Sequence, residues 1–414
     1  MKTPVHPDEA LLHVLTHARA HRSPFENVPL VKALGRVLAC DVPSLLDQPP
    51  FAKTAVDGFA YRRSANAPNE RFRVITVIPA GRMAPLLQPG EAVRIMTGAP
   101  IPENADGVQR VEWTRMEDDH VYFTTTESAS NIIARGENAK RGDVLMSPRI
   151  LTPQDIGILA ASGYAYVPVA RRLRVKVVST GDELFSACIQ KFHDPEAFLH
   201  VETTLGKAGI FDSNGPQLTA CVQSFGADAT FLGIVPDNEQ RMVETITDAI
   251  QTCDVVVVSG GVSMGDFDHI PAVAARVGVT TIFHGVRMRP GMPAYFGVCG
   301  PVAFFGLPGN PVSSFVHAVF FLQPYLNARM GLHTLAPLVP VTLSKRLSRK
   351  KGENVQFWPV RLRWPEGIAE PLAYHGSSMV TVLGDTNAFI RMEEGQTEIQ
   401  PNEIIHARLV RPHH

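Results

Sequence analysis

The spacing of apolar residues changes along the chain, and these changes predict how the chain is organised. Between residues 8 and 20, apolar side chains recur at helical spacing behind Pro7, which predicts an amphipathic helix with Asp8 as its N-cap. From about 46 to 147 the apolar residues form short runs such as Arg73–Ile78, separated by Pro and Gly, which is typical of β-strands. The sequence therefore predicts an N-terminal helix followed by a β-rich insert.

A second helix is predicted after the insert. Thr152 and Asp155 have the spacing of a capping box, Pro153 fits the first helical position, and the helical pattern then ends at a glycine. We expect this helix to rejoin the N-terminal one, so that residues 1–45 and 148–172 form one linking subdomain.

Residues 173–329 alternate apolar, strand-like runs with helical patterns. Such alternation predicts a mostly parallel sheet with helices on both faces and a ligand site at its carboxyl edge. From 330 to 414, short strands spaced by prolines predict a small C-terminal β domain. The expected fold class is α/β plus β, with the insert at 46–147 and a central αβα domain at 173–329. The clearest predicted elements of the central domain are strands at Leu173–Val178, Thr230–Val235 and Val255–Val258, and helices that begin after Asn214, at Asn238 and after Pro311.

Composition mainly argues against certain partners and locations. The length of 414 residues predicts about two to four domains, and 39 basic side chains nearly cancel 40 acidic ones. Without a basic excess we expect no nucleic-acid partner. The first residues lack the apolar core of a secretory signal, and the densest apolar stretch, residues 316–322, is far shorter than the roughly 18–20 residues of a membrane span. We therefore expect a soluble, cytoplasmic protein with no membrane partner.

Cysteine and histidine spacing indicates no metal site. The 5 cysteines include no Cys-x-x-Cys pair, so we expect reduced thiols. His13 and His17 lie four residues apart on the first predicted helix. We expect them to face solvent rather than to bind a metal.

The first candidate for chemistry is an acidic glycine loop, Ser179-Thr180-Gly181-Asp182-Glu183, which directly follows a predicted strand. Hydroxyl and backbone N–H groups there can hold phosphate oxygens, while the two carboxylates can hold a divalent cation. The alternative is a turn whose aspartate caps the next helix.

A second loop repeats this arrangement, because the apolar strand that ends at Val258 leads into Ser259-Gly260-Gly261 and, further on, Asp266 and Asp268. Adjacent glycines let the backbone approach an anion closely, and the carboxylates suit a cation. The following polar residues complete the expected phosphate- and metal-binding edge. They are Asp212, expected to face the same crevice, Asn214, expected to cap a helix, and Asp237, expected either to join this edge or to cap a helix.

Two further segments suit a small tetrahedral anion. Arg289 lies beside Pro290 and Gly291, and the run from Gly306 to Ser313 ends by starting a helix whose N-terminal amides favour negative charge. Each segment alone could equally be a rigid turn.

Taken in order, these motifs resemble the MoeA family, the molybdenum insertases related to the C-terminal region of gephyrin. The resemblance covers almost the whole chain. The matching stretches are Thr54–Ala60, Arg94–Pro100, Arg135–Glu137, Ser179–Leu184, Phe211–Asn214, Ser259–Gly265 and Gly306–Ser313.

The resemblance implies insertion of molybdate into adenylylated molybdopterin, with release of AMP and assistance from Mg²⁺. It also implies an elongated, L-shaped chain of several subdomains, in which 1–45 and 148–172 serve dimerisation, and a homodimer whose site is shared. The implied partners are a molybdopterin-adenylating protein and proteins that mature molybdoenzymes.

Carried over by motif, the resemblance assigns a role to each candidate residue. The catalytic residues would be Asp57, Thr97, Glu137, Asp182 and Glu183. The pterin, nucleotide and molybdate would contact Ser179, Thr180, Gly181, Asp212, Asn214, Ser259, Gly260, Gly261, Ser263, Arg289, Pro293, Pro308, Gly309, Asn310, Ser313 and Ser377. The metal would be held by Asp237, Ser263 and Asp268.

Several positions depart from the family pattern. Met292 and Pro359 stand where the family usually has a lysine and an arginine, and the stretch 185–208 is longer than usual. Two other hypotheses therefore stand beside a working insertase. One is a non-catalytic member that binds pterin or nucleotide as a cofactor carrier, chaperone or interaction partner, and the other is a structural scaffold.

Overall fold

The structure is a computed structural model that describes residues 4–64, 71–125, 130–187, 205–206, 208–262, 269–332 and 337–410. The chain divides into two compact units. Unit 1 comprises Met1–Glu26, Gly35–Ala39 and Val169–His414, and unit 2 comprises Asn27–Leu34 and Cys40–Pro168. The boundaries of the four predicted subdomains stay a prediction.

The centre of unit 1 is a mostly parallel sheet with the strand order β16-β13-β17-β21-β20-β18. The strands β16, β13, β17 and β21 run parallel, while β20 is antiparallel to both β21 and β18. The bounds are β13 Arg174–Thr180, β16 Asp228–Val235, β17 Val255–Ser259, β18 Thr280–His284, β20 Tyr295–Cys299 and β21 Val302–Leu307. Every residue of β17 is buried, as expected for a central strand covered on both faces.

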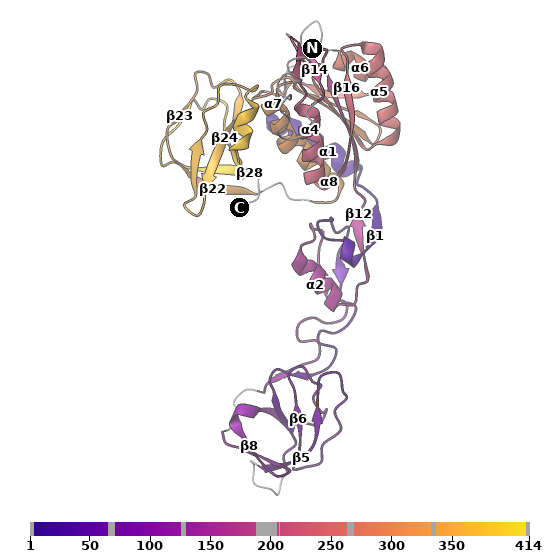
Figure 1. Ribbon diagram of the computed structural model, residues 1–414, viewed down its shortest axis with the longest axis vertical. Coiled ribbons are helices and arrows are strands. Elements are labelled where there is room, and N and C mark those ends of the chain that lie inside the picture. The colour runs from indigo at the N-terminus through magenta and orange to yellow at the C-terminus, as the bar shows by residue number, and fades with distance from the viewer. Residues whose placement is uncertain are drawn as a thin grey trace, which may run out of the picture. The chain divides into compact units, whose positions relative to one another are not determined.

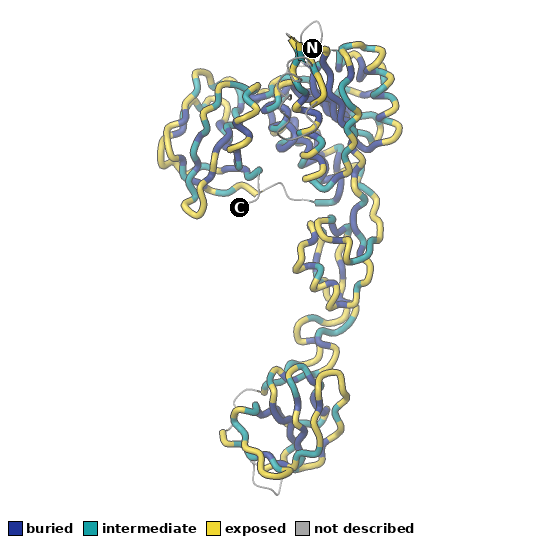
Figure 2. Tube along the Cα trace, in the orientation of Figure 1, coloured by how far each residue is buried: buried dark blue, intermediate teal, exposed yellow. Residues whose placement is uncertain are grey.

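Helices cover both faces of this sheet (Figure 1). Alternate strand residues point to opposite sides, so Val255 and Val257 pack in one apolar cluster while Val256 and Val258 pack in another. The first cluster includes residues of α1 (Pro7–Ala20), α4 (Asn214–Ser224), α7 (Pro311–His317) and α8 (Gln323–Arg329), and the second includes residues of α5 (Glu239–Thr252) and α6 (Ile270–Arg276). The tube in Figure 2 shows the sheet between these helices as largely buried. Within the described ranges, no helix is long and apolar enough to cross a membrane.

The N-terminal helix differs from its expected place. α1 buries Val14 and Ala18 in the core of unit 1, whereas the second predicted helix, α2 (Pro153–Ala161), belongs to unit 2. His17 also differs, because its ring nitrogens contact the Tyr325 hydroxyl at 3.0 Å and the Gly300 carbonyl oxygen at 3.0 Å. The helix face that carries His17 is therefore a packing face, which its apolar spacing alone did not reveal.

The C-terminal strands of unit 1 form a small barrel, because β24, β25, β22, β28 and β26 pair in a closed ring. The short strand β19 joins this ring by pairing with β24. The bounds of these strands are β19 Met288–Arg289, β22 Leu338–Leu343, β24 Val355–Arg363, β25 Ile368–Pro371, β26 Ala388–Met392 and β28 Ile404–Leu409. Outside the barrel sheet, β14 (Leu184–Phe185) pairs with β15 (Ile210–Phe211) and β23 (Leu347–Ser348) pairs with β27 (Glu398–Ile399), and η4 spans Val380–Gly384. Phe357 and Phe389 of the barrel join the same core as α7 and α8, so the barrel and the central sheet share one apolar cluster.

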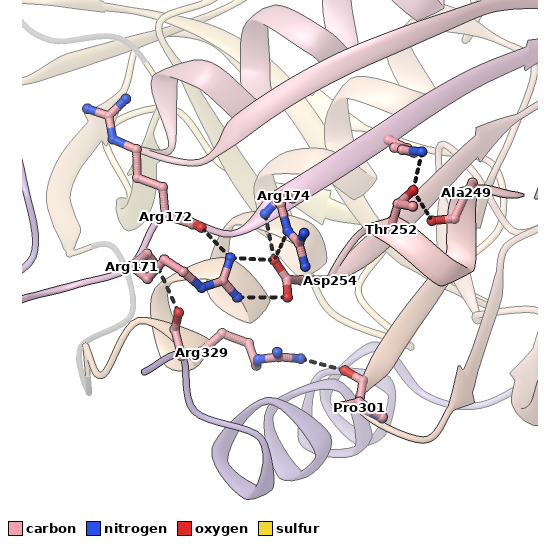
Figure 3. A network of polar contacts seen from close by, with 10 residues as sticks. Arg171, Arg172, Arg174, Ala249, Thr252, Asp254, Pro301 and Arg329 are labelled. Atoms are coloured by element: carbon pink, nitrogen blue, oxygen red, sulfur yellow. Dashed lines mark hydrogen bonds and ion pairs between the residues drawn. The ribbon is translucent and has the colours of Figure 1, made fainter. Parts of the chain in front are cut away.

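A polar network holds the amino edge of the central sheet together (Figure 3). The carboxylate of Asp254, just before β17, accepts hydrogen bonds from both terminal nitrogens of Arg171 at 2.9 and 3.1 Å and from the N–H of Arg174 at 2.8 Å. Nearby, Arg329 donates to the carbonyl oxygen of Pro301 at 2.8 Å. The carboxylate of Asp254 at this edge is therefore fully hydrogen-bonded by the protein itself.

Unit 2 contains a mixed sheet with the order β7-β4-β6-β5-β9-β8, in which β5 and β6 are parallel. Its strands alternate buried and exposed residues only in part, since β4 is buried throughout. The bounds are β2 Val42–Pro43, β3 Lys53–Thr54, β4 Gly58–Tyr61, β5 Arg71–Ile78, β6 Glu91–Ile95, β7 Gly107–Arg110, η2 Val111–Trp113, β8 Thr114–Glu117, β9 His120–Phe123, β10 Ile132–Ile133 and β11 Val144–Met146, with η1 at Leu30–Lys32. β1 (Phe25–Pro29) and β12 (Tyr166–Ala170) pair where the chain passes between the units.

Candidate functional site

A cavity of about 730 Å³ lies at the carboxyl edge of the central sheet, next to the ends of β13 and β17. This volume is within the range of roughly 300–1,000 Å³ that is usual for small-molecule and cofactor sites. The predicted residues that line it are Thr180, Gly181, Glu183, Asp212, Asn214, Asp237, Ser259, Gly260, Gly261, Pro293, Pro308, Gly309, Asn310, Ser313 and Ser377. Segments far apart in the sequence therefore meet at the edge where a parallel sheet binds its ligands.

The first acidic loop continues directly from β13. Its aspartate, Asp182, accepts a hydrogen bond from the N–H of Asp237 at 3.0 Å instead of capping a helix. Thr180 donates its hydroxyl to the carbonyl oxygen of Ser259 at 3.4 Å, which ties this loop to the second one. The alternative interpretation, a turn that caps the next helix, does not describe this loop.

Carboxylates gather at one side of the cavity. The pKa of Asp237 is raised, first by burial and then by the negative charges of Asp182 and Glu183. Oxygen ligands of this kind suit a hard divalent cation, which would also relieve the repulsion among them. Among the residues that the structure describes, no group of three Asp, Glu, His or Cys side chains is arranged to hold a metal ion. The predicted ligands Ser263 and Asp268 lie outside the described residues.

The second loop brings backbone close to the first. Gly260 has φ +99°, and a Cβ at this position would lie 2.6 Å from the carbonyl oxygen of Thr180. A side chain at Gly260 would therefore push the two loops apart. Glycine is required here because neighbouring strand ends approach each other closely. The close approach to an anion that the sequence predicted stays a prediction.

Asp212 lines the cavity, where it was expected, and also takes the capping role that was expected of Asn214. The Oδ1 atom of Asp212 accepts the N–H groups of Asn214 at 3.0 Å and of Gly215 at 3.1 Å, so Asp212 caps α4. Asn214 instead donates its side-chain amide to Ser259 Oγ at 2.7 Å and to the carbonyl oxygen of Gly309 at 2.6 Å. The expectation that Asn214 caps the helix is wrong, because α4 already begins at this residue and its side chain is free to cross to the neighbouring loops.

Buried acceptor atoms near the cavity lack hydrogen-bond partners. Within the described part of the chain, Asp212 Oδ2, Asn214 Oδ1 and the hydroxyl oxygen of Ser179 have none. Ser179 is fully buried at the end of β13 and does not belong to the cavity lining. Unpaired buried polar atoms are uncommon in folded proteins and call for an explanation such as an absent ligand or water.

Only some of the residues that were predicted to contact the anion line the cavity. Gly291, Pro293 and Ser313 line it, while Arg289 and Met292 do not, and Met292 is 46% exposed. Among the described lining residues there are carboxylates but no lysine or arginine. An anion in this cavity would therefore depend on backbone N–H groups, hydroxyls and a bound cation, with Arg289 outside the lining.

The predicted residues Asp57, Thr97 and Glu137 belong to unit 2. The backbone N–H and the hydroxyl of Thr97 donate to Asp57 Oδ1 at 2.6 and 2.7 Å, and these bonds hold the pKa of Asp57 below its usual value. Glu137 accepts the N–H of Ala134 at 2.7 Å. Whether these residues join the cavity of another subunit, as the resemblance implies, stays a prediction.

The sequence interpretation missed some residues at this site. Ser378 and Val380 line the cavity next to the predicted Ser377, and His317 lies beneath the Pro290–Pro293 loop. Helical spacing could have indicated His317, because it follows the predicted Ser313 by four residues and so lies on the same face of α7. No local signal distinguishes Ser378 or Val380.

The fold and cavity define a multidomain α/β protein with a ligand site at the carboxyl edge of its sheet. Three family models match the chain: "MoeA N-terminal region (domain I and II)" at residues 5–163, "Probable molybdopterin binding domain" at 176–328, and "MoeA C-terminal region (domain IV)" at 340–409.

Known proteins show the same similarity over nearly the full length. A molybdopterin molybdenumtransferase of Bacillus subtilis (strain 168) is 32% identical over 424 residues, covering 99% of this chain and 95% of that protein. One of Nostoc sp. (strain PCC 7120 / SAG 25.82 / UTEX 2576) is 37% identical over 389 residues, covering 90% and 86%. A solved molybdopterin biosynthesis MoeA protein of Pyrococcus horikoshii OT3 has a TM-score of 0.82 at 29% identity and covers 99% of this chain and 100% of that one.

The chain therefore belongs to the MoeA family, and the resemblance drawn from the sequence is confirmed. The expected fold class and the expected enzyme class, a transferase, are confirmed with it.

Proposed function

We propose that this chain is a molybdopterin molybdenumtransferase that inserts molybdate into adenylylated molybdopterin, releases AMP and depends on Mg²⁺. The observation that carries the proposal is convergence on one cavity: both acidic glycine loops meet Pro293 and Ser313 there. A nucleotide-linked pterin and an oxyanion need such neighbouring sites, because transfer between two reactants requires both to be held together.

The pterin-nucleotide side is supported by the unpartnered acceptors. Asp212 Oδ2 and Asn214 Oδ1 are buried next to the cavity without described partners, and the amino and ring N–H groups of a pterin are donors. Gly260 and Gly261 would let the phosphate link lie against backbone N–H groups.

The carboxylate side supports a divalent cation. Burial, and then the negative charges of Asp182 and Glu183, raise the pKa of Asp237. Within the described residues these side chains do not by themselves form a three-ligand metal group, so a cation here would also need the predicted ligands Ser263 and Asp268. Mg²⁺ bound there would neutralise charge on the phosphate oxygens as AMP leaves. The residues themselves would hold the cation and orient the phosphate link.

We further propose a cytoplasmic homodimer in which Asp57, Thr97 and Glu137 complete the site of the other subunit. The molybdopterin-adenylating protein would supply the substrate, and molybdoenzyme-maturation proteins would receive the product. Nucleic acid and membranes are not expected partners, since 39 basic side chains nearly balance 40 acidic ones.

The direct test is to incubate the protein with adenylylated molybdopterin, molybdate and Mg²⁺ and to measure AMP release and molybdenum uptake. Asp237→Asn should lower turnover at least about tenfold, because it removes a carboxylate from the cation side. Asp228→Asn is the matched control, since Asp228 lies at the opposite end of β16 and pairs with Arg172 at 3.5 Å. Absence of both AMP release and metal uptake by the unaltered protein would overturn the proposal.

A second candidate is a non-catalytic family member that binds pterin or nucleotide as a carrier or chaperone. It is favoured by one observation, the lack of a basic side chain among the described residues that line the cavity. Tight binding of adenylylated molybdopterin without molybdate-dependent AMP release would select this candidate over the transferase.

A further inference from the structure

His317 is an almost completely buried histidine. It ends α7, is only 2% exposed, and stacks on Phe321 with ring centroids 5.2 Å apart. Its Nε2 atom lies 2.7 Å from the carbonyl oxygen of Gly291. A carbonyl oxygen only accepts, so the proton must sit on Nε2, which defines the tautomer.

The residue that His317 binds belongs to the wall of the cavity. Gly291 has φ +95°, and a Cβ there would lie 2.7 Å from His317 Nε2 and 3.2 Å from the Cβ of Ser313. The loop Arg289–Pro293 therefore lies directly on the face of α7 that carries His317 and Ser313. Gly291, Pro293 and Ser313 all line the cavity.

The hydrogen bond also sets the direction of the next amide. In a trans peptide the C=O and N–H groups point in opposite directions, so a Gly291 carbonyl held toward α7 places the Met292 N–H on the other side of the loop. Met292 itself does not line the cavity, so the hydrogen bond bears on the lining through Gly291 and Pro293, and the described lining has no lysine or arginine to hold an anion. Burial lowers the pKa of His317 to about 4, so its ring adds a donor but no charge at neutral pH.

The helix is itself held on the far side of His317. A π-helical turn, η3 (Ala318–Leu322), follows His317 immediately, and the guanidinium of Arg408 donates to the carbonyl oxygen of Val319 in this turn. Arg408 comes from the barrel and also covers the ring of Phe320 at 4.5 Å. π-Helical turns are rare and occur often at functional sites. The barrel thus holds the turn that directly follows His317.

We propose that His317 is a positioning residue for the oxyanion: its Nε2–H donates to Gly291 and so sets the Arg289–Pro293 loop against Ser313 in the geometry that molybdate requires. This inference rests on the proposed function. His317 touches no substrate in it, and acts through the loop.

The test compares His317→Leu, which fills space without a donor, with His317→Gln, whose side-chain amide can still donate to Gly291. The KM for molybdate is measured at saturating adenylylated molybdopterin, and the KM for adenylylated molybdopterin at saturating molybdate. His317→Leu should raise the KM for molybdate about tenfold or more and leave the other KM within about threefold, while His317→Gln should restore most of the loss. Gly291→Ala should resemble His317→Leu, because its Cβ meets the same imidazole.

His17→Leu is the matched control for a purely structural loss. His17 is another histidine of unit 1 whose Nε2 atom meets a backbone carbonyl, that of Gly300 at 3.0 Å, and it lies away from the lining of the cavity. The His17→Leu variant should have a lower melting temperature but unchanged KM values for molybdate and for adenylylated molybdopterin. Isothermal titration with molybdate alone provides a reading that does not depend on turnover.

The outcomes are distinct. If the unaltered protein binds molybdate and His317→Leu binds it equally well, or if both KM values rise together, or if His317→Gln is as impaired as His317→Leu, the positioning role is wrong while the proposed function stands. If the unaltered protein neither binds molybdate nor releases AMP, the proposed function fails, and this role fails with it.

Discussion

Asp212 and Asp254 are almost equally buried, at 8% and 9% exposure, yet they lie at opposite edges of the central sheet of unit 1 and have different surroundings. At the amino edge, both oxygens of Asp254 accept hydrogen bonds from Arg171, and one also accepts the N–H of Arg174. At the carboxyl edge, Asp212 caps α4 with Oδ1, but Oδ2 has no partner in the described part of the chain. Both carboxylate oxygens of Asp254 therefore have hydrogen-bond partners in the protein, whereas only one oxygen of Asp212 has a described partner.

This difference separates structural from functional polar groups. A buried carboxylate is stable when its lone pairs are filled, and burial of an unfilled one lowers stability. The protein fills them at the amino edge with guanidinium groups and leaves them unfilled beside a cavity of about 730 Å³. Under the proposed function, substrate would complete the hydrogen bonding of the carboxyl edge, and the following variants test this.

The largest expected effect on activity is that of Asp212→Asn. The amide oxygen can still accept from Asn214 and Gly215, but the amide nitrogen places a donor where an acceptor stood. We expect kcat/KM for adenylylated molybdopterin to fall about 100-fold, which corresponds to about 2.7 kcal/mol, with little change in melting temperature. A variant that melts much lower but keeps its activity would place Asp212 with Asp254 as a structural group.

A comparable change at the other edge, Asp254→Asn, should act on stability. The substitution places an amide N–H donor opposite the N–H donors of the Arg171 guanidinium, and it removes the negative charge that pairs with this guanidinium. We expect the free energy of unfolding to fall by about 3 kcal/mol, with kcat/KM of the folded protein unchanged. Denaturant unfolding together with steady-state kinetics measures both quantities, and a loss of activity without a loss of stability would contradict the comparison.

The loss of stability in Asp254→Asn should also depend on pH. Burial alone would raise the pKa of Asp254, but the hydrogen bonds from Arg171 and Arg174 outweigh it and lower the pKa below the ordinary value of 3.8. A carboxyl with a lowered folded pKa contributes stability that is present above the unfolded pKa and is lost as the pH falls through the folded pKa. The stability difference between the unaltered protein and Asp254→Asn should therefore be full at neutral pH and shrink below about pH 4.

The smallest effect is expected for Asp8→Asn, which tests an exposed aspartate against the two buried ones. Asp8 of α1 accepts both terminal nitrogens of Arg391 at 2.6 and 2.9 Å, and these hydrogen bonds lower its pKa. Because its side chain is 60% exposed, solvent screens the pair, and we expect a loss of at most about 1 kcal/mol that diminishes in high salt. Melting temperatures at low and high salt measure this, and an effect as large as that of Asp254→Asn would contradict the order.

Much of the fold could be predicted from the sequence because its signals are local. The apolar run that begins at Val255 predicted a strand buried on both faces, and the structure has β17 at Val255–Ser259. Thr152 and Asp155 predicted a capping box, and both of its hydrogen bonds form at α2. The place of α1 could not be predicted in the same way, because helical spacing shows that a face is apolar but not which core covers it.

The candidate site was predicted to a similar degree. Gly260 and Thr180 could be placed together because they follow strands that a parallel sheet brings to one edge. Asn214 was assigned the wrong role, because its partners Ser259 and Gly309 are distant in the sequence. Arg289 was expected at the anion wall, but only Pro293 and Gly291 of that loop line the cavity.

By itself, the sequence determined the strands, the helices and the two acidic glycine loops, because periodicity and backbone freedom are properties of neighbouring residues. Only the tertiary structure decided which aspartate has both oxygens hydrogen-bonded and which histidine contacts the Arg289–Pro293 loop, since the partners of Asp254 and His317 lie far away in the chain. Identical side chains therefore become structural or functional according to whether the fold itself supplies their partners.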